Sequence, residues 1–175
     1  MYFRFLALIG IFNLPLMRKL LVPFLVFGTV GVVIGWAWSA RTDSDAPGEE
    51  TKSAYSPRNP LELGSAFLLG LVFLVVLAAT NFALIHLGNG GIYAMAFISG
   101  IAPVDPFILG LTQTAGAMTA MNLAVAGVIV AAASNNLAKA FIAFFLADSK
   151  TGRQSLILLL GLTALGLAPL LWSAR

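Results

Sequence analysis

The stretch LLVPFLVFGTVGVVIGWAWSA, residues 20–40, decides the fold class of this chain. It contains no charged side chain, and about 20 apolar residues are what an α-helix needs to cross a bilayer. Trp36 and Trp38 stand near its end, where aromatic side chains mark a membrane interface. Gly31 and Gly35 are four residues apart on one helix face, so a second helix could approach closely there. We therefore predict a membrane-spanning helix over 20–40.

The composition of the whole chain extends this prediction to an all-α polytopic membrane protein. Of its 175 residues, 59% are hydrophobic and 10% are charged, whereas soluble domains average about 45–50% and 25%. The mean hydropathy is +0.95. The bases flank apolar segments, as in the group Arg4, Arg18 and Lys19, and no basic stripe with interleaved aromatics predicts a nucleic-acid partner. With no cysteine and one histidine, the sequence predicts no metal site, no cofactor and no thiol chemistry.

The apolar segments predict about five transmembrane helices and one short N-terminal half-helix. The first apolar run is broken at Asn13–Pro15 and is too short to span. We predict that the full spans lie at 20–40, 60–87, 92–112, 119–146 and 155–173. Five alternating spans would place one set of bases on one side of the membrane, Arg18, Lys19, Lys150 and Arg153, which the compact basic loops suggest is cytoplasmic.

Two connections between the predicted spans have clear signatures. Residues 41–58 form the long polar stretch RTDSDAPGEETKSAYSPR, which predicts a mobile loop within a single transmembrane domain over 1–175. The next span begins at Asn59, Pro60 and Glu62, the pattern of a capped helix start. GNGG at 88–91 predicts a tight turn after that span.

A third feature predicts a broken helix. In SGIAPVDPFILG, residues 99–110, Asp105 lies between Pro103 and Pro106, with Gly100 just upstream. Each proline removes a backbone donor and disfavours helix in the preceding residue. We expect an interruption near 100–106, which a membrane tolerates only where protein or a water-filled cavity covers the freed backbone.

Polar residues of the following span provide candidate partners for this carboxylate. Asn135 and Lys139 are four residues apart and share a helix face. If adjacent spans are antiparallel, the Lys139 side chain leans toward Asp105 and past Asn135. We therefore expect a cluster of Asp105, Asn135 and Lys139 near mid-depth.

The chain also resembles a known family. The segments RFLALIGIFNLPLMRKLLVPF, NPLELGSAF, GNGGIYAMAFISGIAPVDPFILGL and ASNNLAKAF resemble, in that order, the membrane domain of unknown function that forms the C-terminal part of MgtC/SapB-type bacterial inner-membrane proteins. The family stretches look like SG-L-A-D-V-D and SN-x-x-x-K, and Asp105, Ser134, Asn135 and Lys139 match them. Pro103 occupies the place of the first Asp, so a site that needs paired carboxylates would lose one. The resemblance implies a multi-pass protein of the bacterial inner membrane, here without the MgtC/SapB-like portion, which a separate chain could supply.

These observations leave two functions open. In the first, the chain is transporter-like and binds or moves a cation or proton at the mid-membrane cluster, with Lys139 as counter-ion of Asp105. In the second, it is a structural or accessory subunit of a membrane complex, and the cluster joins helices. An enzyme is not expected, because Ser134 has no base nearby on its helix. Expected partners are the lipid bilayer and either further copies of the chain or other membrane subunits.

Overall fold

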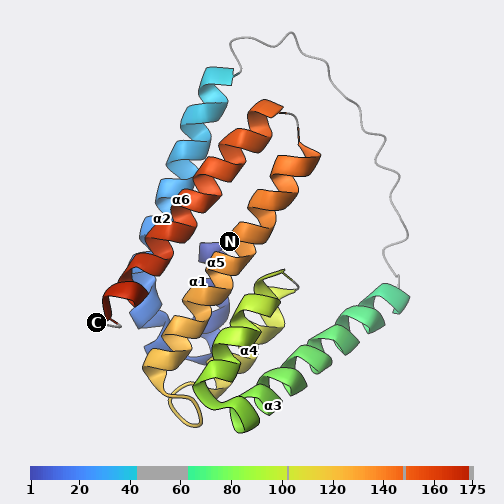
Figure 1. Ribbon diagram of the computed structural model, residues 1–175. Coiled ribbons are helices and arrows are strands. Elements are labelled where there is room, and N and C mark those ends of the chain that lie inside the picture. Colours follow the sequence, from blue (N-terminus) through green and yellow to red (C-terminus); the bar gives the residue numbers. More distant parts are fainter. Residues whose placement is uncertain (43–62, 102, 148, 174–175) are drawn as a thin grey trace.

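The computed structural model describes residues 1–42, 63–101, 103–147 and 149–173, and its architecture is all-α (Figure 1). The only β-type pairing among these residues is an isolated bridge between Ala115 and Thr119. The helices are α1 (Tyr2–Phe12), α2 (Leu14–Thr42), α3 (Leu63–Ile101), α4 (Val104–Thr114), α5 (Met121–Leu146) and α6 (Ser149–Ser173). The predicted all-α membrane fold is therefore confirmed. The predicted loop at 41–58 and the capped start at 59–62 fall almost entirely outside the described residues.

Within the described residues, four helical segments are long and apolar enough to cross a membrane. They are Leu14–Trp38, Ala66–Ala83, Met121–Leu146 and Lys150–Ala168. The helix α1 is apolar but has only 11 residues. At 1.5 Å per residue it is about 16 Å long, half of a hydrocarbon core of about 30 Å. The predicted N-terminal half-helix is confirmed.

The centre of the bundle is α5, of which half is buried inside the protein. Its partner α6 runs antiparallel to it, since Thr163 lies beside Ala133 and Gly152 lies beside Phe144. The same helix α6 also runs antiparallel to α2, because Gly166 faces Phe27 and Leu162 faces Gly31. It follows that α2 and α5 run in the same direction.

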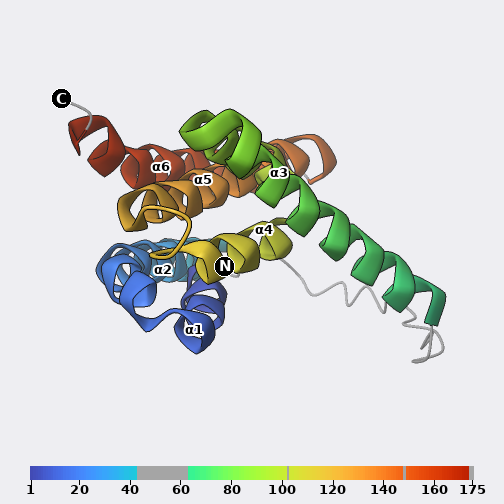
Figure 2. The same ribbon diagram turned by 90° about the horizontal axis from the view of Figure 1, so that it is seen from below.

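The helix α3 is divided at Gly88, where the backbone is not helical. Gly88 has φ +55° and ψ −136°, a left-handed region that favours glycine because a Cβ would clash. A side chain on Gly91 would meet the carbonyl of Ala83, so this position also requires glycine. The predicted turn at 88–91 is present. The part of α3 before it leans away from the bundle, as Figure 2 shows, and only 12% of its window Ala66–Ala83 is buried.

The second part of α3 and the helix α4 form a re-entrant hairpin, not the single span predicted at 92–112. Ile92, near the start of the segment 92–112, and Leu111, near its end, both pack against Gly127 of α5, since a Cβ on Gly127 would meet both side chains. Two residues so far apart in sequence reach one level of α5 only if the chain reverses between them. The reversal lies between Ile101 and Val104. Pro103 stops the helix there, and both limbs of the hairpin pack against Gly127 of α5.

The tip of this hairpin is at the middle of the bundle. A side chain on Gly100 would meet the Cβ and Oγ of Ser134 and the amide of Asn135. Ser134 is near the midpoint of Met121–Leu146, about 20 Å from either end of that helix. The close approach of Gly100 therefore holds the tip at about half the depth of the membrane.

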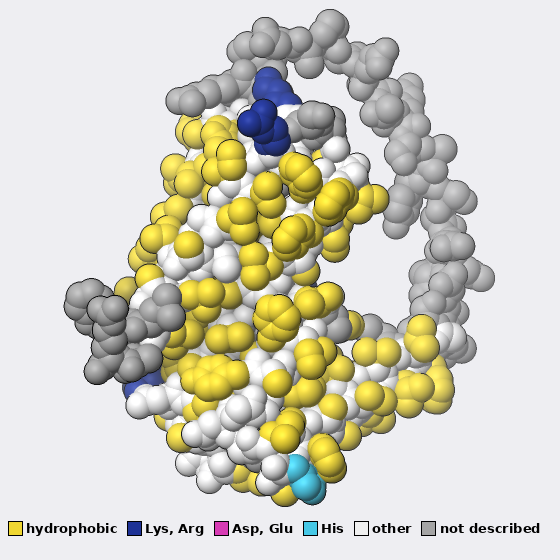
Figure 3. Space-filling view, in the orientation of Figure 1, with side chains coloured by type: hydrophobic (Ala, Val, Ile, Leu, Met, Phe, Trp, Pro, Cys, Tyr) yellow, Lys and Arg dark blue, Asp and Glu magenta, His cyan; other side chains and the backbone are white. Residues whose placement is uncertain are grey.

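Because the hairpin does not cross, the predicted arrangement of the bases is wrong. Lys19 near the start of α2 donates a hydrogen bond to Asn122 near the start of α5, with Nζ and Oδ1 3.3 Å apart. Lys150 and Arg153 lie at the start of α6, at the opposite end of α5. Arg18 and Lys19 are thus separated from Lys150 and Arg153 by the bundle length. In Figure 3 a basic group at one end and the histidine at the other are separated by an apolar belt.

Candidate functional site

Two half-length helices, α1 and α4, lie side by side and run parallel. At one end, Arg4 of α1 contacts Asp105 of α4. At the other, the Asn13 side chain donates from Nδ2 to the carbonyls of Thr112 and Ala115, at 3.0 and 3.1 Å. The contacting residues are 101 positions apart in sequence at the first end and 99 and 102 apart at the second. Because this separation is nearly constant along the pair, the two helices run parallel. Each half-helix begins inside the bundle and ends at the same outer face.

Asn13 explains why the chain can turn there and fix the pair. Its Oδ1 accepts the amide hydrogen of Leu16 at 3.0 Å, which caps the beginning of α2. The carbonyls that its Nδ2 group satisfies stand at the end of α4, where the last turn of a helix leaves carbonyls without intrahelical partners. One side chain therefore joins the α1–α2 connection to the α4–α5 connection.

The first residues of α1 lie at mid-depth. The Tyr2 ring packs against Phe24 and Phe27, with ring centroids 5.2 and 5.7 Å apart. Its hydroxyl accepts a hydrogen bond from Nδ2 of Asn136 at 2.8 Å. Phe27 is near the midpoint of α2 (Leu14–Thr42), and Asn136 is near the midpoint of α5. The beginning of α1 is therefore level with the tip of the re-entrant hairpin.

Asp105 stands at this level in the first turn of α4 and forms an ion pair with Arg4. The guanidinium Nη2 and the carboxylate Oδ1 are 2.8 Å apart. The two side chains are 59% and 40% exposed within the chain, so the pair is accessible from outside the protein core. A carboxylate in the first turn of a helix is also favoured by the helix dipole.

The predicted interruption is confirmed, and the prolines account for its position. Pro103 precedes α4 in an extended conformation, with φ −61° and ψ 105°. Pro106 stands in the first turn of α4, where a missing N–H breaks no helical hydrogen bond. Between them, Asp105 lies in the first turn of α4, a separate helix that begins at mid-depth.

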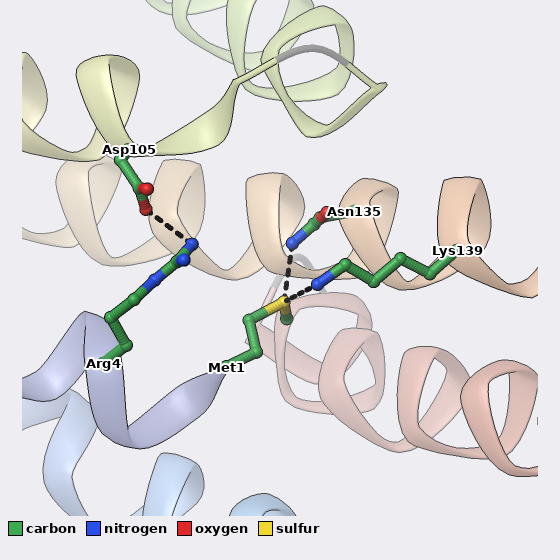
Figure 4. Close-up of polar contacts among 5 residues, drawn as sticks. All are labelled: Met1, Arg4, Asp105, Asn135 and Lys139. Carbon is green, nitrogen blue, oxygen red and sulfur yellow. Dashed lines mark hydrogen bonds and ion pairs between the residues drawn. The ribbon is translucent and has the colours of Figure 1, made fainter. Parts of the chain in front are cut away.

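The residues of the predicted cluster contact two different partners, Met1 just before α1 and Arg4 within it, as Figure 4 shows. Nδ2 of Asn135 and Nζ of Lys139 both point to the sulfur of Met1, at 2.6 and 3.8 Å. These two residues are brought together as expected. The partner of Asp105, however, is Arg4 and not the amide and amine of α5. The difference arises because α1 lies against α4 and supplies a guanidinium at closer range.

Ser134 has a packing role in this arrangement. Its hydroxyl donates to the carbonyl of Phe97 at 2.6 Å, and the side chain is buried. The bond joins α5 to the second part of α3 beside Gly100. Ser134 thus holds the re-entrant hairpin in place.

Sequence reasoning missed Arg4, which it grouped with the bases that flank membrane segments. A signal was available, because Arg4 lies inside the apolar stretch YFRFLALIGIF of α1. An arginine within an apolar segment implies a partner or a water-filled surrounding. No local acid provides that partner, since Asp105 is 101 residues away in sequence.

The donor set limits the ions that this site could hold. Among the described residues there is no group of three or more His, Cys, Asp or Glu side chains able to hold a metal ion. In that part of the chain Asp105 is the only acidic residue. One carboxylate that is already paired with a guanidinium is a poor metal site, because Ca²⁺ and similar ions require six or more oxygen ligands.

Comparison with known proteins gives a family and one distant relative. The model of a domain of unknown function, DUF4010, matches residues 1–147. An uncharacterized protein of Aquifex aeolicus (strain VF5) is 30% identical over 102 residues, which cover 58% of this chain and 44% of that protein. The chain thus spans less than half the length of that relative. No solved structure matches the chain.

Proposed function

The chain belongs to the DUF4010 family, and we propose that it is a transporter-like membrane domain that binds and moves a cation, a proton, at the Arg4–Asp105 pair. The observation that carries the proposal is the position of this pair, at a helix break halfway through the bundle. Ionisable groups within the membrane are costly, by about 2.5–3.5 kcal/mol on insertion scales, and are retained where they serve a pathway or a partner. Transporters place their ion sites at mid-membrane between the ends of discontinuous helices.

The proton is favoured over a metal cation because of the chemistry of the pair. Asp105 binds a proton when its carboxylate is released from Arg4. When the proton leaves, the carboxylate forms the ion pair with Arg4 again. Such an exchange needs one carboxylate and one permanent counter-charge, which is the set that α1 and α4 supply. On this proposal Asn135 and Lys139 form the adjoining part of the site, and the chain performs no catalytic step.

The test is proton flux into proteoliposomes that contain the purified chain and a trapped pH-sensitive dye. The wild type is expected to collapse an imposed pH gradient faster than Asp105→Asn, which cannot bind the exchangeable proton. Arg4→Gln is expected to alter the flux as well, because Asp105 then lacks its counter-charge.

Two control variants make the comparison specific. Asp148→Asn removes an acid that lies between α5 and α6 in sequence, and Arg18→Gln removes an exposed arginine at the beginning of α2. Both should leave the flux at the wild-type value. Equal fluxes in the wild type and Asp105→Asn would contradict the proposal. A flux of Na⁺ in place of H⁺ would mean that the transported cation is Na⁺ and not a proton.

A structural or accessory role is the second candidate, and two contacts favour it. The hydrogen bonds from Ser134 to Phe97 and from Asn136 to Tyr2 join helices and so stabilise the bundle. In addition, the first part of α3 contributes little buried surface to the bundle, so a further copy of the chain or another membrane subunit could pack on it. If Asp105→Asn and Lys139→Met leave flux unchanged but dissociate an assembly on native gels, this candidate is the better one.

The cellular setting is also part of the proposal. We propose that the chain is a multi-pass protein of the bacterial inner membrane and functions with an MgtC/SapB-type module. The four apolar spans and the bacterial relative support the first part, and the ordered motifs given above support the second. Co-purification of the native complex, with identification of its chains by mass spectrometry, tests both.

A further inference from the structure

The bundle contains an open cavity beside the beginning of α1. Its volume is about 240 Å³, and it lies between the beginning of α1 and the helices α2, α5 and α6. The wall is mostly apolar and includes Phe27, Val32, Leu159 and Leu162. The polar side chains that line it are Tyr2, Asn136 and Lys139, and the described lining residues include no carboxylate. Lys139 is therefore the charged side chain among the described residues of this wall.

Lys139 has no anionic partner among the described residues. The ion pair there is that of Arg4 with Asp105, and the Lys139 ammonium contacts the Met1 thioether at 3.8 Å. A thioether is a weak acceptor. Among the described side chains here, Arg4 pairs with Asp105 and Lys139 has no acidic partner. The α-amino group of Met1 lies near Lys139 and Arg4 and adds to the positive charge.

Hydrogen-bond donors also converge at this point without a good acceptor. Asn135 directs its Nδ2 group at the same sulfur of Met1. Tyr2 accepts a hydrogen bond from Asn136, so its own hydroxyl hydrogen is available to another acceptor. The ammonium of Lys139 and the phenol of Tyr2 both line the cavity and can donate to oxygen atoms that carry negative charge.

We propose that this cavity binds a small organic monocarboxylate, with its carboxylate at Lys139 and Tyr2 and its hydrocarbon part against Phe27 and Leu162. The positive charge of Lys139 suits an anionic group, and the apolar wall suits a hydrocarbon tail. This inference rests on the proposed function, in which the carboxylate would be carried together with the proton of Asp105. A proton and a monocarboxylate together carry no net charge.

The experiment measures the binding of radiolabelled benzoate to the full chain in detergent by equilibrium dialysis. Benzoate should bind, and its uncharged analogue benzamide should compete at least tenfold more weakly. Lys139→Met should raise the Kd for benzoate at least tenfold, because a hydrogen-bonded charge pair is lost. Lys19→Met, which removes an ammonium at the end of the bundle, should leave the Kd unchanged.

A second pair of variants tests the cavity without removing the charge. A Cβ on Gly31 would be in ordinary contact with Leu162 at 3.5 Å, whereas a Cβ on Gly35 would meet nothing within 4 Å. Gly31→Leu should therefore fill the cavity and abolish benzoate binding, and Gly35→Leu should not. Circular dichroism and gel filtration establish that each variant is folded.

The outcomes separate this inference from the proposed function. Absence of benzoate binding to the folded wild type, equal binding of benzamide, or an unchanged Kd in Lys139→Met overturns the carboxylate site and leaves the proton flux untouched. Chloride that competes as well as benzoate overturns the role of the apolar wall. Benzoate binding together with a flux that does not depend on Asp105 supports the site and refutes the proton proposal.

Discussion

The Arg4–Asp105 pair allows a quantitative test of its depth in the membrane. At a separation of 2.8 Å and an effective dielectric constant of about 20, the Coulomb attraction is about 6 kcal/mol. Desolvation of both groups offsets much of this attraction. Removal of one partner leaves the other charge alone at mid-depth, at a cost of about 2.5–3.5 kcal/mol. Removal of both leaves no charge, so the double variant should be more stable than the two single costs together predict.

A double-mutant cycle measures this difference. Arg4→Gln, Asp105→Asn and the double variant are unfolded with SDS in bicelles, and the free energies of unfolding are compared with that of the wild type. We expect each single variant to lose about 2–3 kcal/mol and the coupling energy to be of the same size. A pair in the aqueous headgroup region would give a coupling energy below about 1 kcal/mol. Additive single effects would refute both the pairing and the mid-membrane position.

Three further predictions concern the architecture. Gly100→Ala should destabilise the chain by about 1–3 kcal/mol in the same unfolding assay, since the added Cβ meets the middle of α5. Gly35→Ala, in open space, is its control, and equal stability of the two variants would contradict the close approach. Asn13→Leu should cost about 1–3 kcal/mol, because carbonyls at the end of α4 lose their donor; a thermal shift assay that finds no loss would exclude that role. Because the chain has no cysteine, single-cysteine variants report sidedness: Lys19→Cys and Arg153→Cys should react with an impermeant maleimide from opposite sides of the membrane, and labelling of both from one side would mean that residues 92–112 cross it.

The fold class and the positions of the breaks could be predicted from the sequence because they depend on local chemistry. Apolar length indicated the spans, and Pro103 and Gly88 marked interruptions that the structure contains. The direction of the chain after Pro103 could not be predicted in this way. A proline stops a helix, but only the packing of both limbs on Gly127 of α5 decides between a kink and a reversal. Because residues 92–112 were predicted to cross the membrane, the direction of every later helix was predicted the wrong way round.

The candidate site was predicted only in part for a similar reason. Asn135 and Lys139 are neighbours on one helix, so helical periodicity brings them together. The partner of Asp105 lies 101 residues away, on a helix whose placement follows from its packing on α4 and from Asn13. A contact of that kind depends on tertiary structure and leaves no spacing signal in one sequence. The isolated arginine in an apolar segment was the available indication.

The halfway position at which α1 and α4 begin has an electrical consequence. A proton that reaches Asp105 from one aqueous phase crosses about half of the membrane potential, which is worth about 1.2 kcal/mol per 100 mV. That energy changes the occupancy of the carboxylate by a factor of about seven. Protonation of this single residue would then depend on voltage as well as on pH, and an energised cell would load it differently from a resting one.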